Sequence, residues 1–98
     1  MKRTRLLIEE LAENYLNDEN YQRGIISGEW VEKVTTELNL RNLNDLELSN
    51  MWDMVYLTLD HLYNHYFINE EHKMAMKYLD VTSAFTEVVN AESRKRRG

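Results

Sequence analysis

Two histidines at a four-residue spacing are the side chains of this chain that come nearest to a metal-site pattern. On a helix, His61 and His65 lie on one face, as two ligands of one ion require, and His72 follows across the next predicted turn. The segment HLYNH lacks the glutamate that a metalloprotease helix carries beside its first histidine. Polar histidines near a helix end, where positive charge suits the helix dipole, explain the spacing more simply. We therefore expect no metal and no other cofactor.

Carboxylate pairs are the second kind of residue that could do chemistry. Adjacent acidic residues occur at Glu9-Glu10, Asp18-Glu19 and Glu70-Glu71. Acid–base catalysis needs two carboxylates in different environments within one pocket, whereas these pairs lie at predicted helix ends or on polar faces. The chain also has no cysteine nucleophile, no serine in a nucleophile turn and no glycine-rich phosphate loop. The sequence predicts that the protein is not an enzyme.

Length and composition predict one small domain. The 98 residues are 43% hydrophobic and 30% charged, which is typical of a globular chain with a single core. We expect a helical domain over residues 1–92 and a frayed basic tail over 93–98. The absence of cysteine suits a reducing compartment, so the cytoplasm is the expected location. Apolar runs are only a few residues long, so no contact with a membrane is expected.

The fold class predicted by the hydrophobic spacing is all-α. A first helix is expected from about Thr4 to Asn17, because Ile8, Leu11 and Tyr15 share one stripe. A short turn of helix is expected over 21–26. A further helix is expected over 28–38, with Ser27 as its N-terminal cap.

The second half of the chain predicts a long antiparallel helix hairpin over about 45–67 and 70–90. Asn44 and Glu47 have the spacing of a capping box at its start, and Asn69 is expected to cap the second helix. Apolar residues then step by three and four along both helices: Leu48, Trp52, Val55, Leu59, Leu62 and Tyr66, then Met74, Tyr78, Val81, Phe85 and Val88. Two such seams joined by a two-residue loop are expected to pack against each other.

Additional apolar residues lie off the seam of the helix over 45–67. This helix either occupies the centre of the bundle or leaves one side for another chain. A chain this short buries only about 60% of the surface of its unfolded state, so its core alone gives marginal stability and we expect a homo-oligomer. The residues assigned to self-association are Met51, Met54, Leu57 and Tyr63.

The charge distribution suggests a protein partner and favours a basic one. Residues 6–93 contain five basic and seventeen acidic residues, a net charge of −12. Such a surface attracts basic proteins and could mimic a nucleic-acid backbone. The carboxylates assigned to partner binding are Glu9, Glu10, Glu13, Asp18, Glu19, Glu29 and Glu32. Trp30, Trp52 and Tyr21 are the aromatic residues that could anchor a partner, although their spacing suits a core equally well.

The alternative function is nucleic-acid binding through the basic ends of the chain. Arg94, Lys95, Arg96 and Arg97 could contact phosphates, but no aromatic side chain for base stacking lies near them in the sequence. A helical protein that binds another protein is therefore the preferred expectation. The compact, proline-free composition is similar in style to small viral or mobile-element proteins, a likeness that assigns no site.

Overall fold

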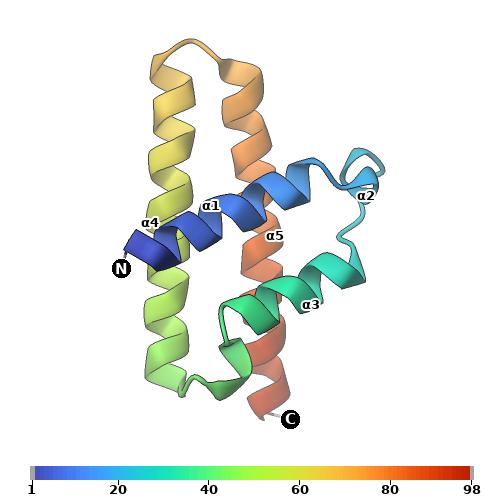
Figure 1. Ribbon diagram of the computed structural model, residues 1–98, viewed down its shortest axis with the longest axis vertical. Coiled ribbons are helices and arrows are strands. Elements are labelled where there is room, and N and C mark those ends of the chain that lie inside the picture. The colour runs from blue at the N-terminus through green and yellow to red at the C-terminus, as the bar shows by residue number, and fades with distance from the viewer. Residues whose placement is uncertain (1, 98) are drawn as a thin grey trace.

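The computed structural model describes residues 2–97 and shows two layers of helices. In chain order these are α1 (Lys2–Leu16), α2 (Glu19–Gln22), α3 (Gly28–Glu37), the 3-10 turn η1 (Leu40–Asn42), α4 (Asp45–Ile68) and α5 (His72–Arg97). Helices α4 and α5 form a long antiparallel hairpin, and α1 and α3 cross in front of it (Figure 1). The predicted all-α bundle with a helix hairpin and shorter N-terminal helices is confirmed.

The hairpin begins where the sequence predicted. The backbone N–H of Glu47 donates to the Asn44 side chain at 2.8 Å, and the Glu47 carboxylate accepts from the Asn44 backbone N–H at 2.9 Å. This capping box satisfies two backbone donors that the first helical turn leaves free. Along the seams, Val55, Leu59, Val81 and Phe85 are fully buried. The two heptad seams therefore meet as predicted.

The turn between α4 and α5 differs from the expectation that Asn69 caps the second helix. Asn69 instead ends α4, and its side-chain amide donates to the His65 carbonyl at 2.8 Å. The backbone N–H groups of Glu70 and Glu71 then donate to Phe67 and Tyr66, which is the pattern of a Schellman motif. Glu70 has a φ of 62° in this motif, where glycine is the usual residue. The connection is therefore three residues long, and α5 starts at His72.

The front layer, which consists of α1, α2 and α3, is fixed to the hairpin by an aromatic cluster around Trp30. The indole N–H of Trp30 donates to the Leu11 carbonyl at 2.9 Å and so joins α3 to α1. The Trp30 ring contacts Tyr15 and Phe85 with centroid distances of 4.8 and 5.1 Å. Ser27 occupies the predicted cap position of α3, but its hydroxyl forms no cap hydrogen bond.

Helix α5, not α4, is the helix on which the other elements converge. Helices α1, α3 and α4 and the turn η1 all pack on it. One of the two arrangements expected for α4, with the three other helices around it, is therefore absent from the described part of the chain. Helix α4 packs on α5 and α1 and keeps one side uncovered.

A frayed tail was expected over residues 93–98. Residues 93–97 instead form the end of helix α5, and residue 98 lies outside the described residues. Arg96 donates to the Leu40 carbonyl at 2.7 Å and contacts the carboxylates of Asp45 and Glu92 at 3.3 and 3.6 Å. The basic residues also suit the negative end of the helix dipole. Arg96 thus ties the end of α5 to η1 and to the start of α4. Over residues 2–97, no helix is long and apolar enough to cross a membrane.

Candidate interaction surfaces

The side of the hairpin that faces away from α1 and α3 carries a stripe of aromatic side chains. We call this surface the hairpin face and define it by Trp52, Tyr56, Tyr63 and Phe67 on α4 and Leu79, Thr82 and Thr86 on α5. Tyr56, Phe67 and Leu79 expose 48%, 51% and 42% of their surface. This is a large exposure for apolar side chains that lie on one side of two packed helices.

The hairpin face contains few polar groups that need water. The hydroxyl of Thr82 donates to the Tyr78 carbonyl, and that of Thr86 donates to the Thr82 carbonyl, both at 2.8 Å. These hydroxyls are satisfied within α5, so the threonines can present their methyl groups. None of the seven defining residues carries a charge. Exposed Asp60, four residues from Tyr56 and seven from Phe67, lies at the edge of the same stripe, so the desolvation cost of covering the face is small only where its carboxylate stays in water.

Aromatic rings form a ridge at the end of the hairpin face nearest the turn. Tyr63 stacks on Phe67 at a centroid distance of 5.8 Å, and Phe67 stacks on His72 at 5.0 Å. This series of rings bridges the two helices. We call it the aromatic ridge.

A hollow of about 400 Å³ lies at the opposite end of the same hairpin. It opens between the start of α4 and the end of α5. Its apolar lining comes from Leu48, Trp52 and Val89, and its polar lining includes Ser49 and Arg97. The hairpin therefore has a ridge at one end and a hollow at the other.

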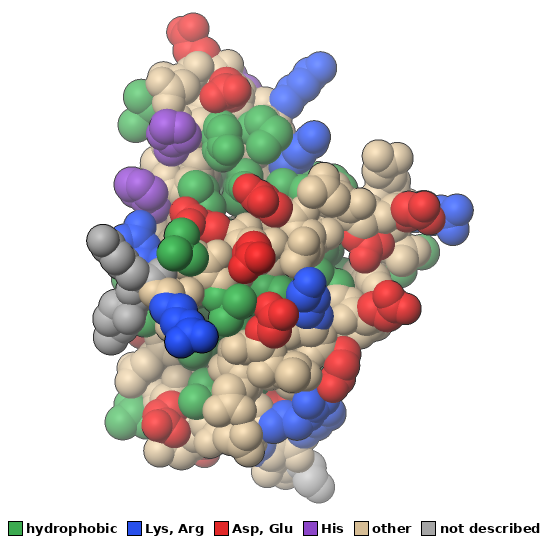
Figure 2. Space-filling model, viewed as in Figure 1, with side chains coloured by type: hydrophobic (Ala, Val, Ile, Leu, Met, Phe, Trp, Pro, Cys, Tyr) green, Lys and Arg blue, Asp and Glu red, His purple; other side chains and the backbone are tan. Residues whose placement is uncertain are grey.

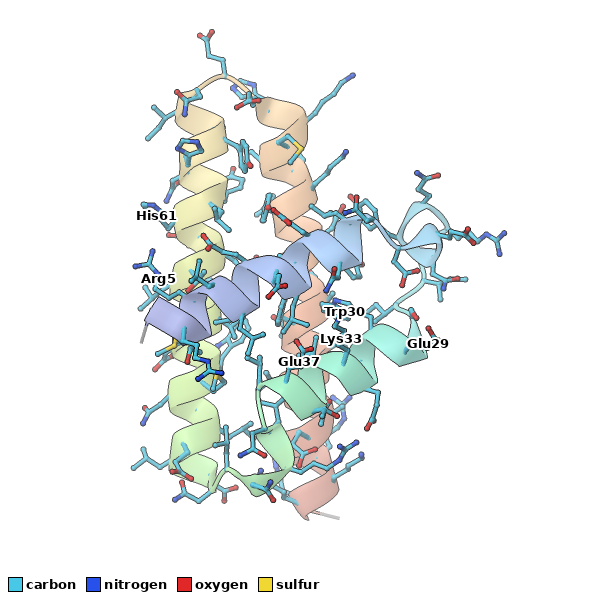
Figure 3. The ribbon with its side chains drawn as sticks, viewed as in Figure 1. Arg5, Glu29, Trp30, Lys33, Glu37 and His61 are labelled. Carbon is cyan, nitrogen blue, oxygen red and sulfur yellow. The ribbon has the colours of Figure 1, made fainter. Side chains whose placement is uncertain are left out.

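The four residues assigned to self-association do not form one surface. Met51, Met54 and Tyr63 are half-buried and pack against the core, whereas Leu57 is 66% exposed. Met54 and Leu57 line a second hollow of about 540 Å³, with Arg5 and His61 at its rim (Figure 3). Only Tyr63 belongs to the hairpin face. Rotation of 100° per residue along α4 places the two groups on different sides of the helix.

The carboxylates assigned to partner binding lie on α1, α2 and α3. Acidic side chains are scattered over this front layer with basic ones between them (Figure 2). Two of the seven are engaged within the chain, since Glu32 pairs with Arg41 at 2.7 Å and Asp18 caps α2. On the outer side of α3, Lys33 lies between Glu29 and Glu37 (Figure 3). The layer therefore presents mixed charge.

Shifted pKa values in the front layer follow from these internal contacts. The hydrogen bond from Arg41 holds the pKa of the Glu32 carboxyl below its usual range. Burial and the hydrogen bond to Asp80, at 2.9 Å, raise the pKa of Tyr21 to about 12. The Glu32 carboxyl and the Tyr21 hydroxyl are therefore both bonded to side chains of this chain. Tyr21 and Trp30 therefore belong to the packing of the front layer, and Trp52 is the tryptophan of the hairpin face.

The basic end of α5 presents three outward cations. Arg94 is exposed, with its nearest carboxylate, on Glu87, at 3.9 Å, and Arg97 donates to the Ser93 hydroxyl at 2.9 Å. Lys95 is also exposed. Arg96 differs from these three because it binds Leu40 and Asp45. The sequence alone predicted the same role, contact with phosphates, for all four basic residues.

The three histidines are divided between two sides of the hairpin. His61 and His65 lie on one side of α4, as their spacing requires, and His65 contacts Tyr66 and Asn69. His72 stacks on Phe67, which lies 200° around the helix from His65. Among residues 2–97, no group of three histidine, aspartate or glutamate side chains is placed to hold a metal ion.

The hairpin face was visible in the sequence only as extra apolar residues. Trp52, Tyr56, Tyr63 and Phe67 are separated by four, seven and four residues, which places them on one stripe of a helix. That spacing is enough to predict the stripe. It does not predict that α1 and α3 leave the stripe uncovered.

Comparison of the chain with protein-family models, curated proteins and solved structures found no match.

Proposed function

We propose that this chain is a non-catalytic interaction protein that binds a protein partner through the hairpin face. The observation that supports this function most strongly is the exposed aromatic stripe of α4, with Tyr56 and Phe67 about half exposed. Tyrosine and tryptophan are the residues most often found as energetic anchors of protein interfaces. An apolar helix face of this kind is a common mode of recognition between proteins.

The composition of the hairpin face supports a protein partner better than a nucleic acid. Its defining residues are uncharged, and its threonine hydroxyls are already bonded within α5. A partner that covers it removes apolar surface from water, which stabilises the complex by about 25 cal/mol per Å² before the costs of association. Nucleic acid would instead require a basic surface with accessible stacking residues.

The mixed charge of the front layer gives it a different role. Carboxylates such as Glu9, Glu10 and Glu13 act on a partner over the range of a Debye length, about 8 Å at physiological salt. We therefore assign them to steering and solubility, and assign binding energy to the hairpin face. Docking on the front layer is the competing version of this proposal.

A photo-crosslinking amino acid tests the two versions directly. It is placed at position 56 in the hairpin face or at position 10 on the outer side of α1, in chains expressed in cells. Tyr56 is 48% exposed and Glu10 is exposed, so both replacements leave the core intact. We expect covalent protein adducts from position 56 and few from position 10.

The outcomes separate the candidate surfaces. Adducts from position 10 alone would contradict docking on the hairpin face and favour the acidic layer. Crosslinks to nucleic acid from either position would contradict a protein partner. The mass of the adduct from position 56 distinguishes another protein from a second copy of this chain.

A further inference from the structure

We propose that the hairpin face is covered by a second copy of this chain, with the two hairpins face to face and antiparallel about a two-fold axis. In this homodimer the turn between α4 and α5 of one copy lies over the start of α4 and the end of α5 in the other copy. The inference rests on the proposed function, because it names the partner for the same surface.

The size of the face matches what a stable dimer needs. The hairpin runs along the long dimension of the molecule, which is 42 Å (Figure 1). Two helices side by side are about 20 Å wide, so this whole side of the hairpin measures on the order of 800 Å² in projection, and the hairpin face is its apolar part. Specific interfaces bury about 800 Å² per partner. A second hairpin is therefore long and wide enough to cover the hairpin face.

The charges at the two ends of the hairpin are complementary in the antiparallel arrangement. The turn carries exposed Glu70 and Glu71 beside exposed Lys73, and the far end carries exposed Arg94, Lys95 and Arg97 beside exposed Asp45 and Glu47. These residues leave a net charge of −1 at the turn and +1 at the far end. Antiparallel pairing places each acidic turn over the basic end of the second copy. Parallel pairing would instead bring the two acidic turns together and the two basic ends together, which is unfavourable.

The shapes of the two ends agree with the same arrangement. The aromatic ridge of Tyr63, Phe67 and His72 lies near the turn, and the 400 Å³ hollow beside Trp52 lies at the far end. A two-fold axis through the middle of the face brings each ridge to the hollow of the second copy. The hollow has apolar walls at Leu48, Trp52 and Val89 and a polar rim, and burial of an aromatic anchor against such walls is the usual form of an interface hot spot.

The middle of the interface identifies the most sensitive residue. Tyr56 lies at the midpoint of α4 (Asp45–Ile68), so in an antiparallel pair it faces Tyr56 of the second copy. Glutamate at this position would place two carboxylates against each other in an apolar interface. Leu57 is the neighbouring residue, is 66% exposed and points to a different side of α4, which makes Leu57→Glu the matched control.

Sedimentation equilibrium over a range of concentrations tests the dimer. We expect the unaltered protein to approach twice the chain mass of 11.8 kDa. Tyr56→Glu is expected to raise the dimer dissociation constant by about 100-fold or more, and Leu57→Glu by less than about threefold. Circular dichroism checks that both variants keep the helical content of the parent. A monomer at high micromolar concentration, or equal effects of the two variants, would overturn the proposal.

A charge exchange tests the antiparallel orientation at low ionic strength. The pair Glu70→Lys and Glu71→Lys, and separately the pair Arg94→Glu and Arg97→Glu, should each raise the dissociation constant by about tenfold. The chain with all four substitutions should return to within about threefold of the parent. Failure of the four substitutions to restore association would overturn this orientation. If the protein stays monomeric while position 56 crosslinks a different protein, the dimer fails and the proposed function stands; if position 56 yields no protein adduct, the proposed function fails as well.

Discussion

Leu59 and Leu57 provide a matched test of how α4 packs, because the same side chain lies two residues apart in opposite environments. Leu59 is fully buried in the seam of the hairpin, whereas Leu57 is 66% exposed. Leu59→Ala removes three carbon atoms from the core, which costs about 2.4 kcal/mol of transfer free energy at ~0.8 kcal/mol per carbon. The cavity left behind adds to this loss, so about 3–4 kcal/mol is expected.

Urea unfolding at a fixed protein concentration, followed by circular dichroism, measures the difference. A domain of this size is stable by roughly 5–15 kcal/mol, so Leu59→Ala should move the midpoint far to lower urea. Leu57→Ala should change the free energy of unfolding by less than about 0.5 kcal/mol. Equal losses for the two variants, or a larger loss for Leu57→Ala, would refute the assignment of the seam.

Three further predictions concern the turn, the tyrosines and the end of α5. Glu70→Gly should raise the free energy of unfolding by about 0.5–1 kcal/mol in urea titrations, because relief of the left-handed φ of 62° exceeds the entropy cost of glycine. Burial, with smaller effects of Tyr66 and Glu13, raises the pKa of Tyr78 from 10 to about 12, so the folded state holds this proton more tightly. The contribution of Tyr78 to stability should therefore be complete below pH 10 and be lost as the pH rises through 12, and Tyr78→Phe should remove one of the two tyrosinate steps near pH 12 in an absorbance titration, the other belonging to Tyr21. Arg96→Ala should cost about 1.5–3 kcal/mol in thermal or urea unfolding through loss of its bond to the Leu40 carbonyl, whereas Arg94→Ala should cost less than about 0.5 kcal/mol.

The contribution of Arg96 also changes how the basic end can be studied. Removal of residues 94–98 would delete three exposed cations together with the contacts of Arg96 to Leu40 and Asp45. A loss of binding after this truncation would mix two causes. Arg94→Glu with Arg97→Glu keeps Arg96 in place and is the cleaner way to test a role of this end in binding nucleic acid or protein.

Local patterns in the sequence were sufficient for most of the fold. The seams through Leu59 and Phe85 and the capping box at Asn44 depend on residues a few positions apart, so both were predicted. The role of Asn69 was not, because an asparagine suits either a helix start or a helix end. Whether Asn69 ends α4 or starts α5 depends on the Schellman hydrogen bonds of Glu70 and Glu71. The usual sequence signal for this motif is a glycine, which is absent here.

The candidate surface depended on packing between distant segments, so the sequence identified only part of it. Tyr63 was selected from its place off the seam, but Met54 and Leu57 were grouped with it although they lie on another side of α4. The separate role of Arg96 likewise depends on Leu40, 56 positions away in the sequence. Tertiary contacts of this range decide which apolar and charged residues remain free for a partner.

Association of the hairpin face with a second copy of this chain is tested most directly by a dilution series followed by nuclear magnetic resonance. Side-chain and backbone signals are compared between high and low micromolar protein. We expect concentration-dependent shifts at Tyr56, Phe67 and Leu79 on the hairpin face, with little change at Leu57 or Glu10. Shifts confined to α1 and α3, or no shifts at any concentration, would contradict the claim.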